Sequence, residues 1–196
     1  MKRLIVKNIG LLTGIGHEEK LCLKGKEMAE FNTLSDAYLV IENGRFADYG
    51  KMNDCPLTSD NEEVVDANGG SVLPSWCDSH THIVYAGSRE QEFVDKIRGL
   101  SYAEIAKRGG GILNSADRLH ELSEDELYQQ AMKRVDEIIR KGTGCVEIKS
   151  GYGLNVEDEL KMLRVIRRIK KTTRLKVVAP FRGAHAVSRK YIGRQD

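Results

Sequence analysis

The segment Asp78-Ser79-His80-Thr81-His82 holds the residue types whose spacing is best suited to chemistry. Side chains two positions apart on a β-strand point to the same side, so an extended backbone would place Asp78, His80 and His82 on one face. Two adjacent imidazoles form half of a binding site for a borderline cation such as zinc or iron(II). A bare pair of histidines with this spacing is more often a surface feature without a ligand. The neighbouring residues therefore decide whether this pair is interpreted as a metal site.

The residues before the histidines favour a metal site. Val72, Pro74 and Trp76 continue the parity of the two histidines along a strand that we predict over residues 71–82. This pattern predicts that the histidines lie on a buried face, where an imidazole without a partner costs desolvation free energy. We therefore interpret His80 and His82 as ligands of one divalent metal ion.

The first 70 residues read as strands and turns. An apolar run covers 3–9, two strand-like runs at 37–42 and 45–49 flank Asn43-Gly44, and a further strand is expected at 62–66. Asn-Gly between two such runs is a strong signal for a β-hairpin. This region therefore predicts a small β module that is not a complete barrel.

From residue 71 onward, strands alternate with helices. After the first strand we expect a short helix at 102–108, a long helix that begins at the capping box of Ser123 and Glu126, and a strand at 145–150. A helix capped by Asn155 and a strand at 175–180 follow, and this alternation indicates parallel strands with helical crossovers. The predicted inward-facing residues of the two long helices are Leu127, Ala131, Val135 and Ile138, then Leu160, Leu163, Ile166 and Ile169.

Composition and charge exclude several classes of protein. The 196 residues include 31 Lys or Arg and 29 Asp or Glu, for a formal net charge of +2. This balance argues against a nucleic-acid-binding protein, which needs an uncompensated basic field. The sequence predicts no membrane span or targeting peptide, and its four cysteines, which lack CxxC spacing, predict reduced thiols in a cytoplasmic protein.

The stretch VLPSWCDSHTH at 72–82 resembles the first-strand signature of the amidohydrolase superfamily. The resemblance implies an α/β fold that is the N-terminal part of a metal-dependent (β/α)8 barrel, preceded by part of a small β-sandwich. Residues 1–70 would be the β-sandwich portion, and residues 71–196 the first βα units of an incomplete barrel, because a whole barrel takes about 250 residues. Ser75 departs from the Gly of many members, but it precedes the two histidines.

Within this superfamily the chain resembles the imidazolonepropionase family. The resemblance implies that Arg89 binds the propionate of the substrate, and that Tyr152 and His185 contact the substrate and its ring. A guanidinium group is well suited to bind a carboxylate through two parallel hydrogen bonds. The segments that carry the resemblance are YAGSREQEF at 85–93, GGGI at 109–112, EIKSGYGL at 147–154 and FRGAHA at 181–186.

The activity implied by the resemblance is hydrolysis of the cyclic amide of 4-imidazolone-5-propanoate to N-formimidoyl-L-glutamate in histidine degradation. It would use one divalent metal, zinc or iron, and a small-molecule substrate that carries a carboxylate. A later His and a later Asp as metal ligands, and the general base, are expected beyond Asp196. We therefore expect a truncated chain that is inactive by itself.

Two alternatives stay open. One is another amidohydrolase, an aminohydrolase or deaminase that acts on a purine or a triazine. Arg89 argues against it, since those substrates carry no propionate. The other is a non-catalytic fragment with an incomplete metal site, which a measurement of activity would distinguish from an enzyme. The sequence does not distinguish zinc from iron, or a monomer from a homodimer.

Overall fold

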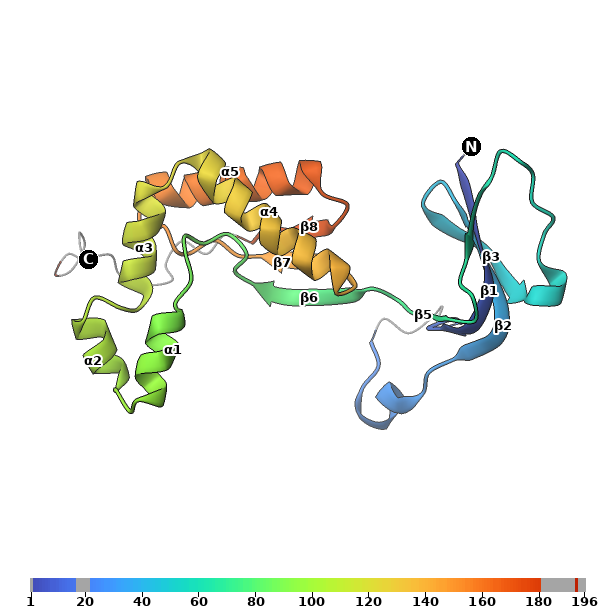
Figure 1. The fold of residues 1–196 in the computed structure, drawn as a ribbon, viewed down its shortest axis with the longest axis horizontal. Helices are drawn as coiled ribbons and strands as arrows, with labels where there is room; N and C mark the ends of the chain where they lie inside the picture. Colours follow the sequence, from blue (N-terminus) through green and yellow to red (C-terminus); the bar gives the residue numbers. More distant parts are fainter. Residues whose placement is uncertain (1, 17–21, 181–192, 194–196) are drawn as a thin grey trace. The chain divides into compact units, whose positions relative to one another are not determined.

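The chain forms two compact units, Met1–Pro74 and Ser75–Asp196, in the computed structural model (Figure 1). The structure describes residues 2–16, 22–180 and 193. The first unit contains strands β1 to β5 with two short 3-10 helices, Gly25–Ala29 and Met52–Asp54. The second contains strands β6 to β8 and helices α1 to α5, and it carries the candidate site residues that the structure describes.

The first unit is a five-stranded sheet built around β1 (Arg3–Thr13). β1 pairs antiparallel with β2 (Thr33–Glu42) and parallel with β4 (Glu63–Asp66) and β5 (Ser71–Val72). β2 turns through Asn43-Gly44 into β3 (Arg45–Lys51). The φ angles of 52° at Asn43 and 77° at Gly44 are those that a two-residue hairpin turn requires, so the predicted hairpin is confirmed.

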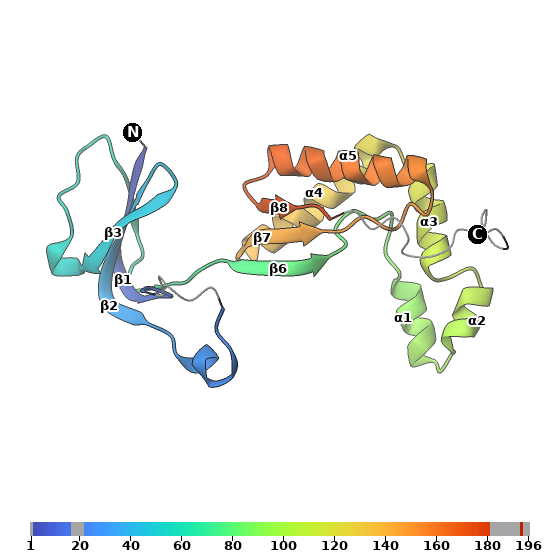
Figure 2. The ribbon, with the colours of Figure 1, turned by 180° about the vertical axis from the view of Figure 1, so that it is seen from behind.

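The second unit is built on a parallel sheet with the strand order β6-β7-β8. These strands are Trp76–Thr81, Thr143–Ile148 and Lys176–Val178. Helices α4 (Glu124–Arg140) and α5 (Val156–Thr172) cover one face of this sheet in both views (Figures 1 and 2). Val146 and Ile148 of β7 are fully buried in the core that these helices share with the sheet, as expected for βα units.

Both long helices begin at the predicted caps. Ser123 and Glu126 form a capping box, and Asn155 Oδ1 accepts a hydrogen bond of 2.9 Å from Asp158 N. On α4, the predicted Leu127, Ala131 and Val135 are fully buried, and Ile138 packs against the same core.

One residue of the predicted stripe on α5 is wrong. Leu160 is 49% exposed, whereas Met162, Val165, Ile166 and Ile169 are buried. Leu160 precedes Met162 by two positions, which is about 200° of rotation on an α-helix, so both cannot face the sheet. Leu163 packs at the edge of the core.

We expect Ser123→Ala to lower the free energy of unfolding by about 1 kcal/mol, because the backbone amide of Glu126 at the start of α4 loses its side-chain acceptor. Denaturant unfolding of the wild type and the variant measures the difference. Glu126→Gln is the matched control, since Gln also completes a capping box. Equal stability of wild type and Ser123→Ala would contradict the assigned cap.

The single strand predicted over residues 71–82 is wrong. β5 ends at Val72 and pairs with Leu11 and Leu12 of the first unit, whereas β6 begins at Trp76 and pairs with β7. Pro74 lies between the two strands and has no amide hydrogen to donate to a sheet ladder. Two different sheets therefore share a stretch that reads as one strand in the sequence.

The predicted burial of this strand's histidine face is also wrong. Trp76 is 68% exposed, Asp78 and His80 are exposed, and His82 is half-buried. β6 is an outer strand of its sheet, so its side chains lack the cover that β7 receives.

The alternation that was expected to place Asp78 beside the histidines is interrupted. Asp78 aligns with Val146 and Thr81 with Ile148, so the strand has one extra residue between these pairs. Such a bulge changes which face the following side chains take. Asp78 therefore lies on the Val146 side of the sheet, and its carboxylate accepts a hydrogen bond of 3.1 Å from the backbone amide of His80.

Three shorter helices follow β6 and lie beyond its carboxyl end (Figures 1 and 2). They are α1 (Glu90–Ile97), α2 (Tyr102–Lys107) and α3 (Ile112–Glu121). The helix predicted at 102–108 is confirmed as α2, whereas α1 and α3 were not predicted. Over the described part of the chain, no helix has the length and apolar character to cross a membrane.

Candidate active site

His80 and His82 lie side by side at the carboxyl end of β6. Their ring centroids are 5.9 Å apart and their planes make an angle of 62°. When two imidazole rings bind the same zinc ion, with zinc–nitrogen distances of about 2.0–2.1 Å, their ring centroids are no more than about 6.5 Å apart. Both rings are therefore close enough to reach the same metal ion. The described residues contain no group of three or more His, Cys, Asp or Glu that could hold a metal.

Tyr152 reaches the same place from the loop after β7. Its ring stacks on the ring of His82, with centroids 4.7 Å apart and an interplanar angle of 21°. The ends of the two strands are joined here, because Thr81 Oγ1 donates to the carbonyl of Glu147 at 2.6 Å and Lys149 N donates to the carbonyl of Thr81 at 3.0 Å. Parallel pairing of β6 and β7 thus brings together two residues far apart in sequence.

A cavity of about 240 Å³ opens beside this stack. It brings together His82, Tyr152 and Arg89, three of the residues predicted from the sequence, while His80 lies outside its lining. His185 lies outside the described residues. The cavity is also lined by Tyr85, Gly87, Ser88 and Ser115.

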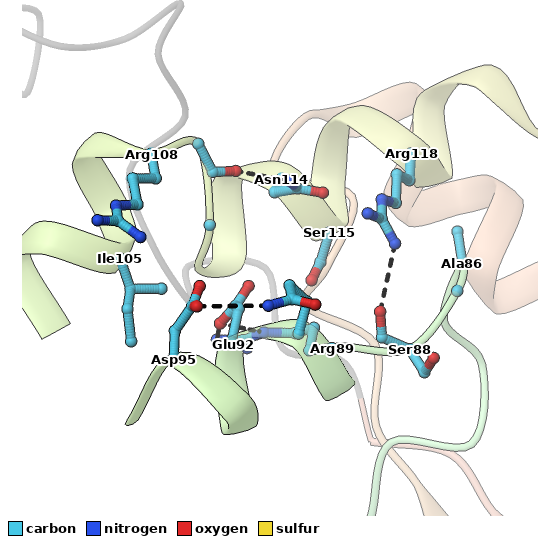
Figure 3. A pocket seen from close by; sticks show the side chains of 14 residues that line it. Ala86, Ser88, Arg89, Glu92, Asp95, Ile105, Arg108, Asn114, Ser115 and Arg118 are labelled. Carbon is cyan, nitrogen blue, oxygen red and sulfur yellow. Dashed lines mark hydrogen bonds and ion pairs between the residues drawn. The ribbon is translucent and has the colours of Figure 1, made fainter. Parts of the chain in front are cut away.

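Arg89 is held by an acidic residue of α1 that the sequence reading did not single out. Its Nε and Nη2 atoms lie 2.9 and 2.5 Å from one carboxylate oxygen of Glu92 (Figure 3). The other carboxylate oxygen accepts a hydrogen bond of 2.8 Å from Gly111 N. The hydrogen bond between them raises the pKa of Arg89 and lowers the pKa of Glu92, so both stay ionised. Arg89 is therefore an oriented cation in the cavity wall.

A second cavity of about 160 Å³ adjoins the first and shares Gly87, Ser88, Arg89 and Ser115 with it. Arg118 of α3 faces it and donates to the carbonyl of Ser88 at 3.2 Å (Figure 3). Glu92 lies within the 85–93 segment, so a signal for it existed in the sequence. Nothing in the sequence reading indicated Ser115 or Arg118, because α3 was not predicted.

The turn that follows the histidines is fixed by Arg134 of α4. Its Nη1 donates to the carbonyls of Ile83 and Tyr85 at 2.9 and 3.1 Å, and its guanidinium lies 3.5 Å from the centroid of the Tyr85 ring. Burial lowers the pKa of Arg134. A cation from the core-facing helix thus sets the backbone that leads from His82 to Arg89.

The chain is similar in sequence to several curated imidazolonepropionases. It is 53% identical over 189 residues to that of Christiangramia forsetii, which covers 96% of this chain and 46% of the relative. The imidazolonepropionase of Flavobacterium johnsoniae is 52% identical over 187 residues, which cover 95% of this chain and 45% of the relative. That of Clostridium tetani is 43% identical over 197 residues, which cover 98% of this chain and 46% of the relative. The chain thus spans about half the length of these relatives. No family model matches it.

Solved structures show the same fold at low sequence identity. A triazine hydrolase from Arthrobacter aurescens superposes with a TM-score of 0.62 at 14% identity, over 92% of this chain and 36% of that one. The N-isopropylammelide isopropylaminohydrolase from Burkholderia multivorans gives a TM-score of 0.51 at 14% identity, over 91% and 37%.

These structures confirm the predicted fold class, the first part of a (β/α)8 amidohydrolase barrel preceded by part of a β-sandwich. By sequence, therefore, the chain matches about half the length of the curated imidazolonepropionases, and its fold matches part of these hydrolase structures.

Proposed function

We propose that this protein is a metal-dependent hydrolase that opens the cyclic amide of 4-imidazolone-5-propanoate to give N-formimidoyl-L-glutamate. The observation that carries the proposal is the cavity that places the Arg89 guanidinium near the stacked rings of His82 and Tyr152. It offers a cation for a carboxylate and an aromatic wall for a flat ring. The similarity to curated imidazolonepropionases supports this choice of substrate.

Arg89 binds the propionate and sets the orientation of the substrate. Glu92 fixes the guanidinium through Nε and Nη2, so the fork is oriented before the substrate arrives. A preoriented guanidinium loses less conformational entropy when it binds a carboxylate. Tyr152 lines the same cavity and contacts the ring, and His185 is proposed to contact it as well.

His80 and His82 hold one divalent metal, zinc or iron. Their ring spacing of 5.9 Å suits two ligands of one ion, and imidazole nitrogen is a good donor to either metal. When bound, such a metal supplies a water-derived nucleophile at neutral pH and polarises the carbonyl that is attacked. A protein of similar fold, a variant of atrazine chlorohydrolase from Arthrobacter aurescens TC1, was crystallised with zinc.

We also propose a cytoplasmic location. Cys22, Cys55, Cys77 and Cys145 are all free thiols, as is usual in a reducing compartment. This agrees with an enzyme that acts on a small metabolite.

The test is turnover by the full-length protein loaded with zinc or with iron(II). Loss of the imidazolone absorbance, and a product heavier than the substrate by one water, are the expected results. A triazine or purine amine without a carboxylate serves as the comparison substrate and should not react. Faster hydrolysis of that comparison substrate would favour an aminohydrolase, and no hydrolysis of either would favour a non-catalytic role.

A further inference from the structure

A buried carboxylate lies beneath the loop that carries Tyr152. Glu159, in the first turn of α5, is only 5% exposed. Its two oxygens accept hydrogen bonds from three backbone amides, those of Gly151 at 2.9 Å, Gly153 at 2.8 Å and Leu154 at 3.3 Å. One side chain therefore holds the backbone on both sides of Tyr152.

This arrangement is not needed to build the helix. Asn155 already caps α5, and Glu157 shows that an acidic side chain near the same helix end can lie in solvent. Burying a carboxylate is costly unless its oxygens are hydrogen-bonded, and bonds to an ionised acceptor are stronger than neutral ones. The three amides satisfy Glu159, and in return Glu159 fixes their orientation.

The loop itself has little freedom to choose another path. Gly151 and Leu154 have φ angles of 119° and 55°, in the positive range that residues other than glycine rarely adopt. A Cβ atom at Gly153 would lie only 2.4 Å from the backbone nitrogen of Glu159, so the loop packs directly on the helix. The ring of Tyr152, between the held amides, stacks on His82 and lines the cavity that contains Arg89.

We propose that Glu159 is a positioning residue that sets the Tyr152 ring against His82 and thereby shapes the wall of the substrate cavity. Its effect on turnover rests on the proposed function. Glu159 is not among the residues that line the cavity, so it acts through the loop. The role differs from simple stabilisation, because it predicts a change at His82 as well as a change in stability.

The first measurement follows the His82 ring directly. The full-length protein is labelled with ¹³C-histidine, freed of metal with a chelator, and compared by NMR as wild type, Tyr152→Ala, Glu159→Gln and the matched control Glu157→Gln. His82 is assigned by its loss in His82→Gln. The ring current of Tyr152 should shift the His82 signal, so Tyr152→Ala moves it.

In Glu159→Gln, the side-chain NH2 group replaces an oxygen that accepts a hydrogen bond from the loop, so two donors face each other and the loop shifts. The variant should therefore move the His82 signal in the same direction as Tyr152→Ala. Glu157→Gln should leave the signal where it is. If Glu159→Gln does not fold, Glu159→Asp keeps the charge but is too short to reach all three amides. An unmoved His82 signal in the folded Glu159 variant, or in Tyr152→Ala, overturns the proposal.

The second measurement is steady-state hydrolysis of 4-imidazolone-5-propanoate by the same proteins. Glu159→Gln should lower kcat/KM roughly ten- to hundredfold, as expected for a misplaced contact residue. Because Glu159 acts through Tyr152, adding Glu159→Gln to Tyr152→Ala should cause little further loss. Fully additive losses would overturn the proposal. Wild type without turnover would contradict only the proposed function, since the NMR comparison still decides the positioning.

Discussion

Replacing His80 and His82 together by alanine is expected to remove the bound metal and with it the hydrolytic activity of the full-length protein. The two rings are the adjacent imidazole donors at the end of β6, and their spacing of 5.9 Å fits one ion. Losing an outer-shell partner of a ligand already costs about 10- to 100-fold in metal affinity, so losing both ligands should cost more. Elemental analysis after dialysis in metal-limited buffer measures the metal content.

His120→Ala is the matched control for this experiment. His120 lies on α3, where its Nδ1 is 2.9 Å from Asp158, and it has no proposed part in the metal site. Its variant should keep the metal. Equal metal content in the wild type and in the double variant would rule out the assignment of His80 and His82.

The two single variants should differ from each other. His82 also carries the stack with Tyr152 and lines the cavity, whereas His80 is exposed and lies outside it. His82→Ala should therefore raise KM as well as weaken metal binding. His80→Ala should weaken metal binding without a separate rise in KM.

Replacing Arg89 by methionine should lower kcat/KM for the carboxylate substrate by roughly ten- to hundredfold, which corresponds to about 1.5–3 kcal/mol for a lost charge-assisted contact. The stability of the fold should change little, because the Arg89 side chain is 41% exposed and Glu92 keeps its hydrogen bond from Gly111 N. Steady-state kinetics of the full-length variant measure the effect. Wild-type kinetics in Arg89→Met would place the carboxylate anchor elsewhere.

The ion pair with Glu92 calls for two controls. Arg89→Met leaves the Glu92 carboxylate, whose side chain is 15% exposed, without its arginine partner and able to repel the substrate. The double variant Arg89→Met/Glu92→Gln removes that repulsion, so any activity it recovers measures the effect of Glu92. A substrate analogue without the carboxylate should react equally with the wild type and with Arg89→Met.

Local interactions are what the sequence predicted well. The Asn43-Gly44 hairpin and the Ser123 capping box depend on residues within three positions of each other, so the tertiary environment hardly alters them. The apolar stripe of α4 was also predicted, because a single helix needs only one buried face. The candidate residues Arg89 and Tyr152 came from the resemblance of short segments, and the cavity does contain both side chains.

Tertiary structure alone decided what covers each strand and what holds each candidate side chain. The stretch at 71–82 divides between two sheets, and β6 remains exposed, because pairing and cover depend on partners distant in sequence. The same reason explains why the stack of Tyr152 on His82 and the hold of Glu92 on Arg89 could not be predicted. Residue types and spacing determined which chemistry is available, whereas the pairing of β6 with β7 and the packing of α1 and α5 decided which groups meet.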